Sequence, residues 1–474
     1  MSKQAKQPDG ESGAAAPIRD LAKLRALACK LHQEKRLDEA VGAYQAYLAA
    51  RPNDAGIWSN LGVALRAQTR LRAAALCYRR ALEVEPGEPS FLGNLGNVLK
   101  DLDELEESIA VQRKAVAQKP DDVRLRYNLG LAYREAADFE KALEAFDAAI
   151  ALNPKDPHMQ WDRALALLHL GRFGEGWAAY EWRWRIGELP PPDFKVPAWR
   201  GEDLDGKTIL LTPEQGFGDT ILVSRLIPQV KARGATVWLE CKPPLLRLFD
   251  GVAGIDRLVA PGSLKDGFDY HCSLMSLPGL LRVTHDTVPP PAALSVPSAA
   301  REKARRLLAP AGDRFKVGIV WSGSVTYKGN RKRAAGLERF MDLAAVPGVQ
   351  LYSLYKGPLE PQLKEQGAGG LVVDLGGQDE DLADTAAAIE KLDLVIMTDS
   401  AVAHLTGTLG RPIWNLLSYS PYWLYGPTGE TTSWYPSMRL YRQPAPGDWD
   451  SVFARVHADL TAAAAAKQAG AKPA

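Results

Sequence analysis

The strongest constraint on this chain is an internal repeat that runs from about Ile18 to Ile186. Small and apolar residues recur at an offset of about 34 residues. One copy carries Trp58, Leu61, Gly62, Leu65, Ala74, Tyr78, Ala81 and Pro86, and the next carries Leu92, Leu95, Gly96, Leu99, Ser108, Gln112, Ala115 and Pro120. A later copy carries Leu129, Gly130, Tyr133, Ala142, Phe146, Ala149 and Pro154, and an earlier one Leu24, Ala28, Leu31, Ala40, Tyr44, Tyr47 and Pro52. Each copy predicts a helix pair whose apolar face is buried only when its neighbour stacks on it, so we expect an α-helical solenoid.

This offset is the tetratricopeptide period, and a fifth, divergent copy starts near Asp156. Its end is unusually aromatic, with Trp182-Arg183-Trp184-Arg185. These side chains could contact a substrate, but we favour a helix that docks the solenoid on the next domain through aromatic and arginine packing. Solenoids present concave surfaces to extended peptides or helices, so we expect this half to bind a protein partner.

Length and charge limit the remaining possibilities. A chain of 474 residues exceeds what one hydrophobic core usually organises, so two or three domains are expected. A net charge of +1 argues against a general polyanion binder, including a nucleic-acid binder. The four cysteines are too far apart for a Cys-x-x-Cys metal or redox site, which favours a reducing compartment and no metal. Because no apolar run approaches the roughly 20 residues that span a bilayer, we expect a cytoplasmic protein.

The pattern changes to α/β after a proline-rich hinge at Leu189–Asp205. Runs of buried-strand type follow at Lys207–Thr212, Thr236–Glu240, Ile255–Val259, Phe268–Cys272, Phe315–Trp321, Val349–Leu354 and Leu371–Asp374. A second proline-rich crossing, Val288–Pro297, suggests a boundary between two lobes. A final helix is expected from Asp448 to about Leu460, with a frayed end after it.

The segment Leu392–Leu417 predicts a β-α-β unit with a very short turn. An apolar strand stops at Thr398-Asp399-Ser400, a helix follows from Ala401 to Leu409, and Gly410 is placed to end it in a left-handed conformation. Ligands bind at the carboxyl edge of parallel strands, and the free N–H groups of a helix start favour anions. We therefore interpret Asp399–His404 as a phosphate-binding corner; a capped core helix without a ligand is an equal alternative.

The loop after the first α/β strand offers two interpretations. Gly216 and Gly218 open a helix after a strand, and Glu240 follows about 20 residues later, as in dinucleotide-binding loops. This is the case for an NAD-type oxidoreductase. Against it, the third glycine is missing and the Asp219 carboxylate would face a pyrophosphate unfavourably. A carboxylate at a helix start could also be an N-cap, or a general base for a substrate hydroxyl.

The motif Asp399-Ser400-x-x-x-His404-x-x-x-x-Leu409-Gly410 resembles that of the heptosyltransferase-like GT-B glycosyltransferases. Glu214, Gln215, Gly216, Gly218 and Asp219 match the first loop of the form in which bacterial tetratricopeptide repeats are joined to such a transferase. The resemblance covers nearly the whole chain. It implies two Rossmann-like lobes and an inverting, metal-independent transfer with Asp219 as the catalytic base, supported by its loop.

The resemblance also implies which residues hold the donor. Ser322, Gly323, Ser324, Ser400 and the helix from Ala401 would hold phosphate, together with Asp399 and His404, and Arg333 and Lys356 would offset developing negative charge. This sequence departs from the family where Ser324 replaces Asn, Arg331 replaces Asp and Ala334 replaces Ser. The donor could be a UDP-, GDP- or ADP-sugar or a CMP-linked sugar. The aromatic segment Ser418–Pro436 is either a wall of this cleft or packing between the lobes.

Together these patterns predict five segments. They are a disordered tail at 1–17, tetratricopeptide repeats at 18–187, an acceptor lobe at 188–300, a nucleotide-sugar lobe at 301–460 and a flexible tail at 461–474. We expect a glycosyltransferase that modifies Ser or Thr of a protein recruited by the repeats, such as flagellin or another exported protein. A catalytically idle scaffold that binds proteins is the alternative from a different class.

Overall fold

The computed structural model describes residues 20–214, 216–327 and 329–470. The predicted tail at 1–17 and Gln215 of the predicted loop lie outside the described residues. Internal contacts divide the chain into two compact units, Met1–Ala132 and Tyr133–Ala474. This division falls within the repeats and follows compactness alone, so the domain boundaries given above stay predictions.

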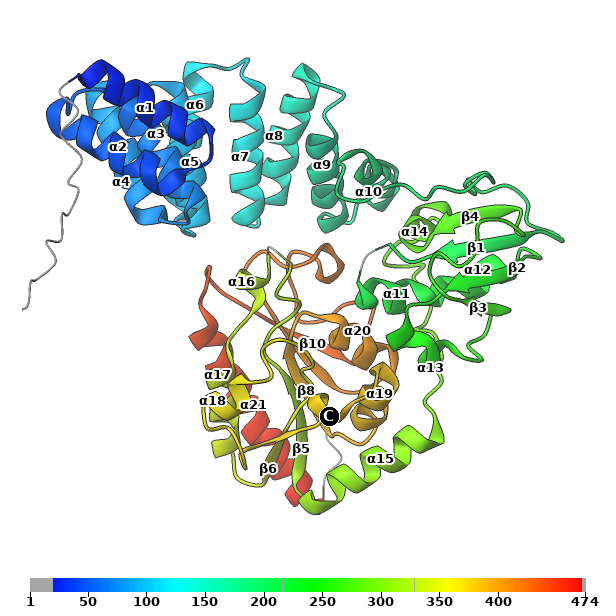
Figure 1. The fold of residues 1–474 in the computed structure, drawn as a ribbon. Helices are drawn as coiled ribbons and strands as arrows, with labels where there is room; N and C mark the ends of the chain where they lie inside the picture. Colours follow the sequence, from blue (N-terminus) through cyan, green and yellow to red (C-terminus); the bar gives the residue numbers. More distant parts are fainter. Residues whose placement is uncertain (1–19, 215, 328, 471–474) are drawn as a thin grey trace, which may run out of the picture. The chain divides into compact units, whose positions relative to one another are not determined.

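The first unit is a stack of helix pairs (Figure 1). Its helices are α1 Leu21–Gln33, α2 Leu37–Ala50, α3 Ala55–Ala67, α4 Leu71–Val84, α5 Pro89–Asp101, α6 Leu105–Gln118 and the start of α7 Val123–Glu135. The repeat glycines let paired helices approach closely. A Cβ on Gly62 would lie 2.8 Å from the Tyr78 ring, and one on Gly96 would lie 2.6 Å from the Gln112 side chain. The predicted helical repeat is confirmed.

The second unit begins with the last repeat helices. These are α8 Phe139–Leu152, α9 Pro157–His169, α10 Phe173–Tyr180 and the 3-10 turn η1 Glu181–Arg185. Asp156 accepts hydrogen bonds from the N–H groups of His158 and Met159, which places the start of the fifth copy where the sequence predicted it. Phe173, Trp177 and Tyr180 are buried in the large core of this unit and not on the solenoid surface.

A parallel four-stranded sheet follows, with the order β3-β2-β1-β4. Its strands are β1 Thr208–Thr212, β2 Thr236–Glu240, β3 Arg257–Val259 and β4 Tyr270–Ser273. Its helical segments are α11 Phe217–Val223, η2 Ser224–Leu226, α12 Ile227–Lys231, η3 Pro243–Leu245, α13 Leu246–Phe249, η4 Leu274–Ser276 and α14 Leu277–Leu280. The first helix of this region starts at Phe217 and is interrupted at η2, which ends two residues before Pro228, a residue that cannot continue the hydrogen-bond ladder.

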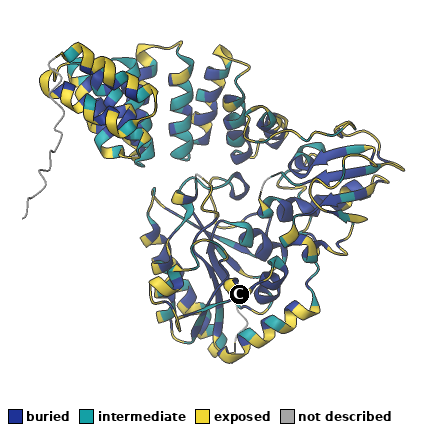
Figure 2. Cartoon of the chain, in the orientation of Figure 1, coloured by how far each residue is buried: buried dark blue, intermediate teal, exposed yellow. Residues whose placement is uncertain are grey.

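A parallel six-stranded sheet completes the unit, with the order β10-β9-β8-β5-β6-β7. Its strands are β5 Phe315–Val320, β6 Val349–Ser353, β7 Val372–Asp374, β8 Leu394–Thr398, β9 Ile413–Leu417 and β10 Met438–Arg442. Its helical segments are α15 Ser298–Leu308, η5 Ala309–Ala311, α16 Asn330–Arg333, α17 Leu337–Met341, η6 Asp342–Ala345, α18 Gln362–Glu365, η7 Gly376–Gln378, α19 Leu382–Ile389, α20 Ala401–Thr408, η8 Trp423–Tyr425 and α21 Trp449–Gln468. The strands are mostly buried, although Val373 and Asp374 of β7 are only partly so, whereas α15 exposes one face (Figure 2).

The strand order fixes where a ligand can bind. In both sheets the first strand lies between the second and the fourth, so the direction of winding reverses between β1 and β4 and between β5 and β8. Doubly wound sheets bind ligands at such reversals, outside the carboxyl ends of the strands. The loops at these points hold Glu214, Gly216, Ser322, Asp399 and Ser400, which are all residues that the sequence singled out.

In the C-terminal region one expectation was wrong and one strand was missed. The last helix continues past Leu460 to Gln468, because an alanine-rich run has high helix propensity and Ala464 is buried. The strand β10 was not predicted at all, since Arg439 and Arg442 interrupt its apolar pattern. In the described ranges no helix is long and apolar enough to cross a membrane.

Candidate functional site

The loop after β1 presents Asp219 on the first turn of α11. Gly216 is the N-cap of this helix, and Asp219 is its third residue. The Asp219 Oδ2 atom accepts a hydrogen bond of 3.0 Å from the Gly216 N–H group. Asp219 is therefore not the N-cap, and within the described part of the chain its Oδ1 atom has no hydrogen-bond partner.

The helices α11 and α20 pack directly against each other (Figure 1). A Cβ on Gly218 would lie 2.6 Å from Cδ2 of His404 and 3.2 Å from Cα of Ala401. Glycine suits this approach, because a larger residue would overlap the His404 ring and press on the backbone at Ala401. The structure thus brings the predicted base loop and the predicted phosphate corner together, although about 180 residues separate them in the sequence.

The surroundings of Asp219 favour its protonated form. Burial raises the pKa of Asp219 to about 6, the Gly216 N–H group opposes that rise, the negative charges of Glu214 and Asp399 add to it, and Lys242 reduces it. A carboxylate with this pKa is ionised at neutral pH and still basic enough to take a proton from a hydroxyl as that proton leaves.

The N-terminus of α20 has backbone N–H groups that are available to a ligand. Ser400 is its N-cap in an extended conformation (φ −160°), and its side chain does not cap the helix. Among residues that the structure describes, the N–H groups of Ala401 and Val402 have no acceptor. Free N–H groups at a helix start favour anions.

Asp399 and Arg333 lie beside this helix start. One carboxylate oxygen of Asp399 accepts a 2.7 Å bond from the Tyr425 hydroxyl, and the other accepts one of 3.2 Å from Arg333. Arg333 also stacks on the ring of Tyr327 at 4.4 Å. Its buried Nε atom has no partner in the described ranges, so the guanidinium can still donate.

The loop after β5 lies beside the same site. Gly323 is close to it, since a Cβ there would lie 3.4 Å from both Nη2 of Arg333 and the Asp399 carbonyl oxygen. The Gly323 N–H group donates to Oδ1 of Asn330 (3.0 Å), and the Asn330 amide donates to the Ser322 hydroxyl (2.9 Å). These bonds engage the Gly323 N–H group as a donor and the Ser322 hydroxyl as an acceptor, both of which the sequence assigned to phosphate. Ser324 is exposed and pairs with Thr326.

Lys356 belongs to a different cluster. It donates to the carbonyl oxygen of Asp379, whose side chain accepts a 2.7 Å bond from Thr385. Burial raises the pKa of Asp379 to about 6, and Lys356 opposes this rise. The contacts of Lys356 thus tie it to the start of α19 and not to Asp219 and Arg333.

His404 is held by the aromatic segment after β9. Its Nδ1 atom lies 3.1 Å from the Tyr435 hydroxyl, and burial lowers its pKa to about 4, which keeps the imidazole neutral at neutral pH. Trp423 of the same segment packs on Trp177 of α10, with ring centroids 5.0 Å apart. The aromatic segment therefore packs on α10 through Trp423, and through Tyr425 and Tyr435 it also contacts residues of the site.

Sequence reasoning did not find the partner of Glu214. The Arg183 side chain is fully buried and donates to both Glu214 oxygens at 2.6 and 2.9 Å. It lies 4.4 Å from the Trp184 ring, so the docking interpretation of this aromatic stretch is the one the structure favours. The spacing of apolar residues in the sequence does not indicate a side-chain pair such as Arg183 and Glu214, because the two residues belong to different motifs.

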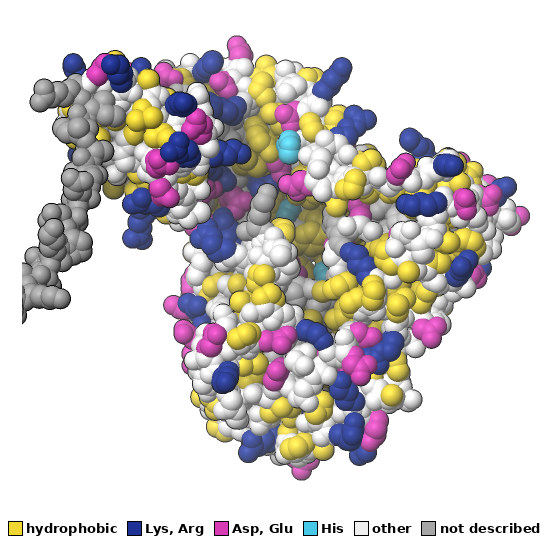
Figure 3. All heavy atoms as spheres, viewed as in Figure 1, with side chains coloured by type: hydrophobic (Ala, Val, Ile, Leu, Met, Phe, Trp, Pro, Cys, Tyr) yellow, Lys and Arg dark blue, Asp and Glu magenta, His cyan; other side chains and the backbone are white. Residues whose placement is uncertain are grey.

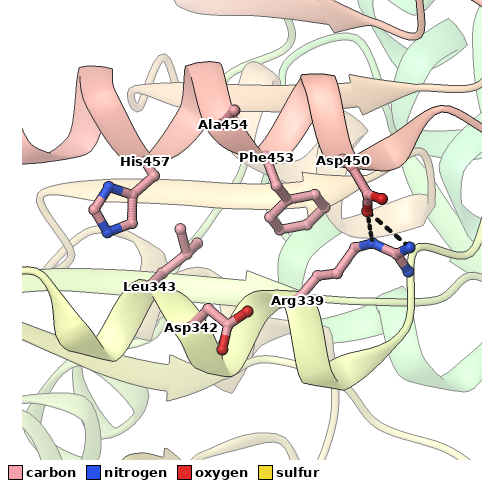
Figure 4. Close-up of a pocket in the computed structure, with 7 residues that line it drawn as sticks. All are labelled: Arg339, Asp342, Leu343, Asp450, Phe453, Ala454 and His457. Atoms are coloured by element: carbon pink, nitrogen blue, oxygen red, sulfur yellow. Dashed lines mark hydrogen bonds and ion pairs between the residues drawn. The ribbon is translucent and has the colours of Figure 1, made fainter.

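A shallow pocket of about 270 Å³ lies elsewhere, between α17, η6 and α21 (Figure 4). An ion pair of 3.0 Å between Arg339 and Asp450 crosses one end of it. On the visible face of the molecule, Lys and Arg alternate with Asp and Glu and form no large field of one sign (Figure 3). This agrees with the near-zero net charge.

Comparisons with known proteins identify the repeats. A tetratricopeptide repeat family model matches residues 59–123 and 127–181. The N-terminal helices are therefore tetratricopeptide repeats, a class of protein-binding module. Among solved structures, MamA of Desulfovibrio magneticus RS-1 is 22% identical and covers 36% of this chain and 96% of its own, with a TM-score of 0.32. YrrB, a TPR protein with an unusual peptide-binding site, is 17% identical over 35% of this chain and 87% of its own, with a TM-score of 0.32.

One curated relative extends beyond the repeats. Protein FlbA of Caulobacter vibrioides is 31% identical over an alignment of 319 residues, which covers 61% of this chain and 52% of that protein. The chain thus spans about half the length of the curated relative that it matches. A match of 319 residues exceeds the predicted repeat region of 18–187, so the similarity reaches into the α/β region.

Proposed function

We propose that the α/β region is a GT-B glycosyltransferase that moves a sugar from a nucleotide-sugar to a Ser or Thr hydroxyl of a protein. One observation carries the proposal: Asp219, with a pKa of about 6, stands beside the open N-terminus of α20. A proton acceptor and an anion-binding helix end are the two groups that such a transfer needs in one place. The two parallel sheets and their strand orders are compatible with the two lobes of this fold.

The proposed reaction is a single displacement. The acceptor hydroxyl gives its proton to Oδ1 of Asp219 while its oxygen attacks the anomeric carbon, and the bond from that carbon to the phosphate oxygen breaks. The nucleotide leaves as an anion, and the anomeric centre is inverted. The N–H groups of Ala401 and Val402, the Ser400 hydroxyl and Arg333 would stabilise the charge that develops on the leaving phosphate.

The repeats support a protein acceptor. Tetratricopeptide solenoids bind extended peptides or helices on their concave face, and this chain joins such a solenoid to the proposed transferase. From the family resemblance we propose flagellin or another exported protein as the acceptor. The donor would be a UDP-, GDP-, ADP- or CMP-linked sugar.

The test is release of nucleotide from a panel of these donors, with intact-mass analysis of proteins encoded by neighbouring genes. Asp219→Asn should lower turnover by about 10²–10⁴-fold, since that is the usual contribution of a general base. Asp266→Asn, a change at an exposed carboxylate of the same region, should have no effect. Turnover that survives Asp219→Asn would remove the base assignment, and a panel without any turnover would remove the transferase.

A protein-binding scaffold with an idle α/β half is the second candidate. It is favoured by the internal use of the Gly323 N–H group and of both Asp399 oxygens, which reduces the groups left for a donor. It predicts capture of a partner by the repeats without turnover. The oxidoreductase alternative predicts thermal stabilisation by a nicotinamide dinucleotide. In the structure Glu240, the acid that it would use for a ribose, accepts a 2.9 Å bond from Gly262 N–H.

A further inference from the structure

The 3-10 turn η1, at the end of the predicted repeat segment, contacts the loop that carries Asp219. Arg183 of η1 has no exposed side-chain surface, and it donates to Glu214 with two bonds of 2.6 and 2.9 Å. Its remaining donors bind Glu181 at 2.7 Å and Ser276 at 2.8 Å. Two parallel hydrogen bonds from a guanidinium to a carboxylate fix the orientation of the carboxylate as well as its distance from the guanidinium.

Glu214 is held from a second side at the reversal point of the four-stranded sheet. Ser273, the last residue of β4, donates to the same Glu214 oxygen that Arg183 Nη2 contacts. Ser276 of η4 also donates to Glu181, so η1, the end of β4 and η4 share one hydrogen-bonded group. The start of the loop is therefore fixed by three segments that lie outside it.

We propose that Arg183, a residue of the repeats, is a positioning residue for Asp219 and makes the last repeat turn part of the catalytic site. This inference rests on the proposed function. The loop between Glu214 and Asp219 is short, and its two ends are held differently. Arg183 and Ser273 hold the first end, and the contact of Gly218 with α20 holds the second. A carboxylate that must meet a hydroxyl within hydrogen-bond distance loses much of its effect when it is displaced by about 1 Å.

Electrostatic interactions also link Arg183 to Asp219. The groups whose charges act on Asp219 are Glu214, Asp399 and Lys242, and Tyr422 and Tyr435 also face it. Glu214 is the nearest of these in sequence, and its charge is balanced by a residue of the repeats. A change in the last repeat turn therefore alters both the position and the electrostatic surroundings of the proposed base.

The first experiment compares Arg183→Met with Arg185→Met in the full-length chain. Arg185 lies two residues further on in the same turn, but it is exposed and stacks on Trp182 at 4.5 Å. Arg183→Met should speed amide hydrogen exchange at residues 216–219 by about tenfold or more, because charge-assisted bonds that restrain the loop are lost. With a donor that the protein accepts, kcat should fall while the donor KM changes little. Arg185→Met should change neither quantity.

Two milder variants test the same role if Arg183→Met does not fold. Arg183→Lys keeps the charge but not the two parallel bonds, and Glu214→Gln keeps the shape but not the charge, so both should increase exchange at residues 216–219 by less. Unchanged exchange in all three variants would overturn the positioning role, whatever the activity. Increased exchange in a protein that turns over no donor would instead support the positioning role and refute the proposed function.

Discussion

Replacing Asp219 by asparagine should make the protein more stable while it removes the proposed activity. The pKa of Asp219 is about 6 in the folded protein and 3.8 as its usual value, so the folded state binds the proton more tightly than the unfolded state does. The free energy of unfolding that Asp219 contributes is therefore lost as the pH rises from about 4 through 6. The shift corresponds to a penalty of about 3 kcal/mol at pH 7 and about 1.5 kcal/mol at pH 5. Asparagine cannot ionise and still accepts the bond from Gly216, so it avoids this penalty.

The assay is urea unfolding at pH 5 and pH 7, followed by tryptophan fluorescence. Of the 12 tryptophans, only Trp58 precedes Tyr133, so the signal reports mainly on the unit that contains Asp219. Asp219→Asn should gain stability at both pH values, and the gain should be larger at pH 7 by about 1.5 kcal/mol. A variant that is destabilised, or whose gain is the same at both pH values, would refute a raised pKa at this position. Asp266→Asn is the control, because its carboxylate is exposed.

Three further predictions test the surroundings of the site. Glu214→Gln removes a negative charge that raises the pKa of the proposed base, so the acidic limb of a kcat/KM profile should move to lower pH; an unchanged limb would contradict this coupling. Gly218→Ala should cost about 1–3 kcal/mol in urea unfolding, because its Cβ would lie 2.6 Å from His404. Gly216→Ala, whose Cβ would have its nearest neighbour, Oδ2 of Asp219, at 3.6 Å, should be close to neutral, and equal costs would show that helix contact is not the cause. Tyr425→Phe removes the hydroxyl that binds Asp399 and should cost about 1–3 kcal/mol; a cost near zero would mean that the bond contributes nothing.

The parts that the sequence predicted well depend on local signals. The helix after β8 ends at Thr408 with Leu409 as its C-cap, one residue before the predicted end, and Gly410 has φ +65°, as expected of a left-handed residue that ends a helix. The strand β9 runs from Ile413 to Leu417 as predicted, because the Arg411-Pro412 pair stops the helix and an apolar run follows. The repeats were predictable for the same reason, since each copy carries its own pattern.

The parts that were not predicted are side-chain pairs between distant segments. Tyr425 binds Asp399 across 26 residues, and Arg183 binds Glu214 across 31. The Asn330 side chain accepts a hydrogen bond from the Gly323 N–H group, which the sequence assigned to phosphate. Each of these residues had a plausible local role, and only tertiary packing decides which partner is in reach. Periodicity and capping rules therefore locate the site but do not say which of its groups remain available.

The charges around α20 explain how two carboxylates could serve a site that is proposed to bind an anion. Both oxygens of Asp399 are engaged, one by Arg333 and one by the Tyr425 hydroxyl, so its charge is balanced within the protein. The Oδ2 atom of Asp219 is held by Gly216, which leaves Oδ1 as the oxygen without a partner among the described residues. A phosphate would then bind at the helix start and at the remaining donors of Arg333, while the acceptor hydroxyl would approach Oδ1. The charge of Asp399 is thus paired within the protein, while the Asp219 carboxylate is oriented toward the acceptor hydroxyl. The proposed transfer requires this arrangement, because a phosphate must bind close to both carboxylates.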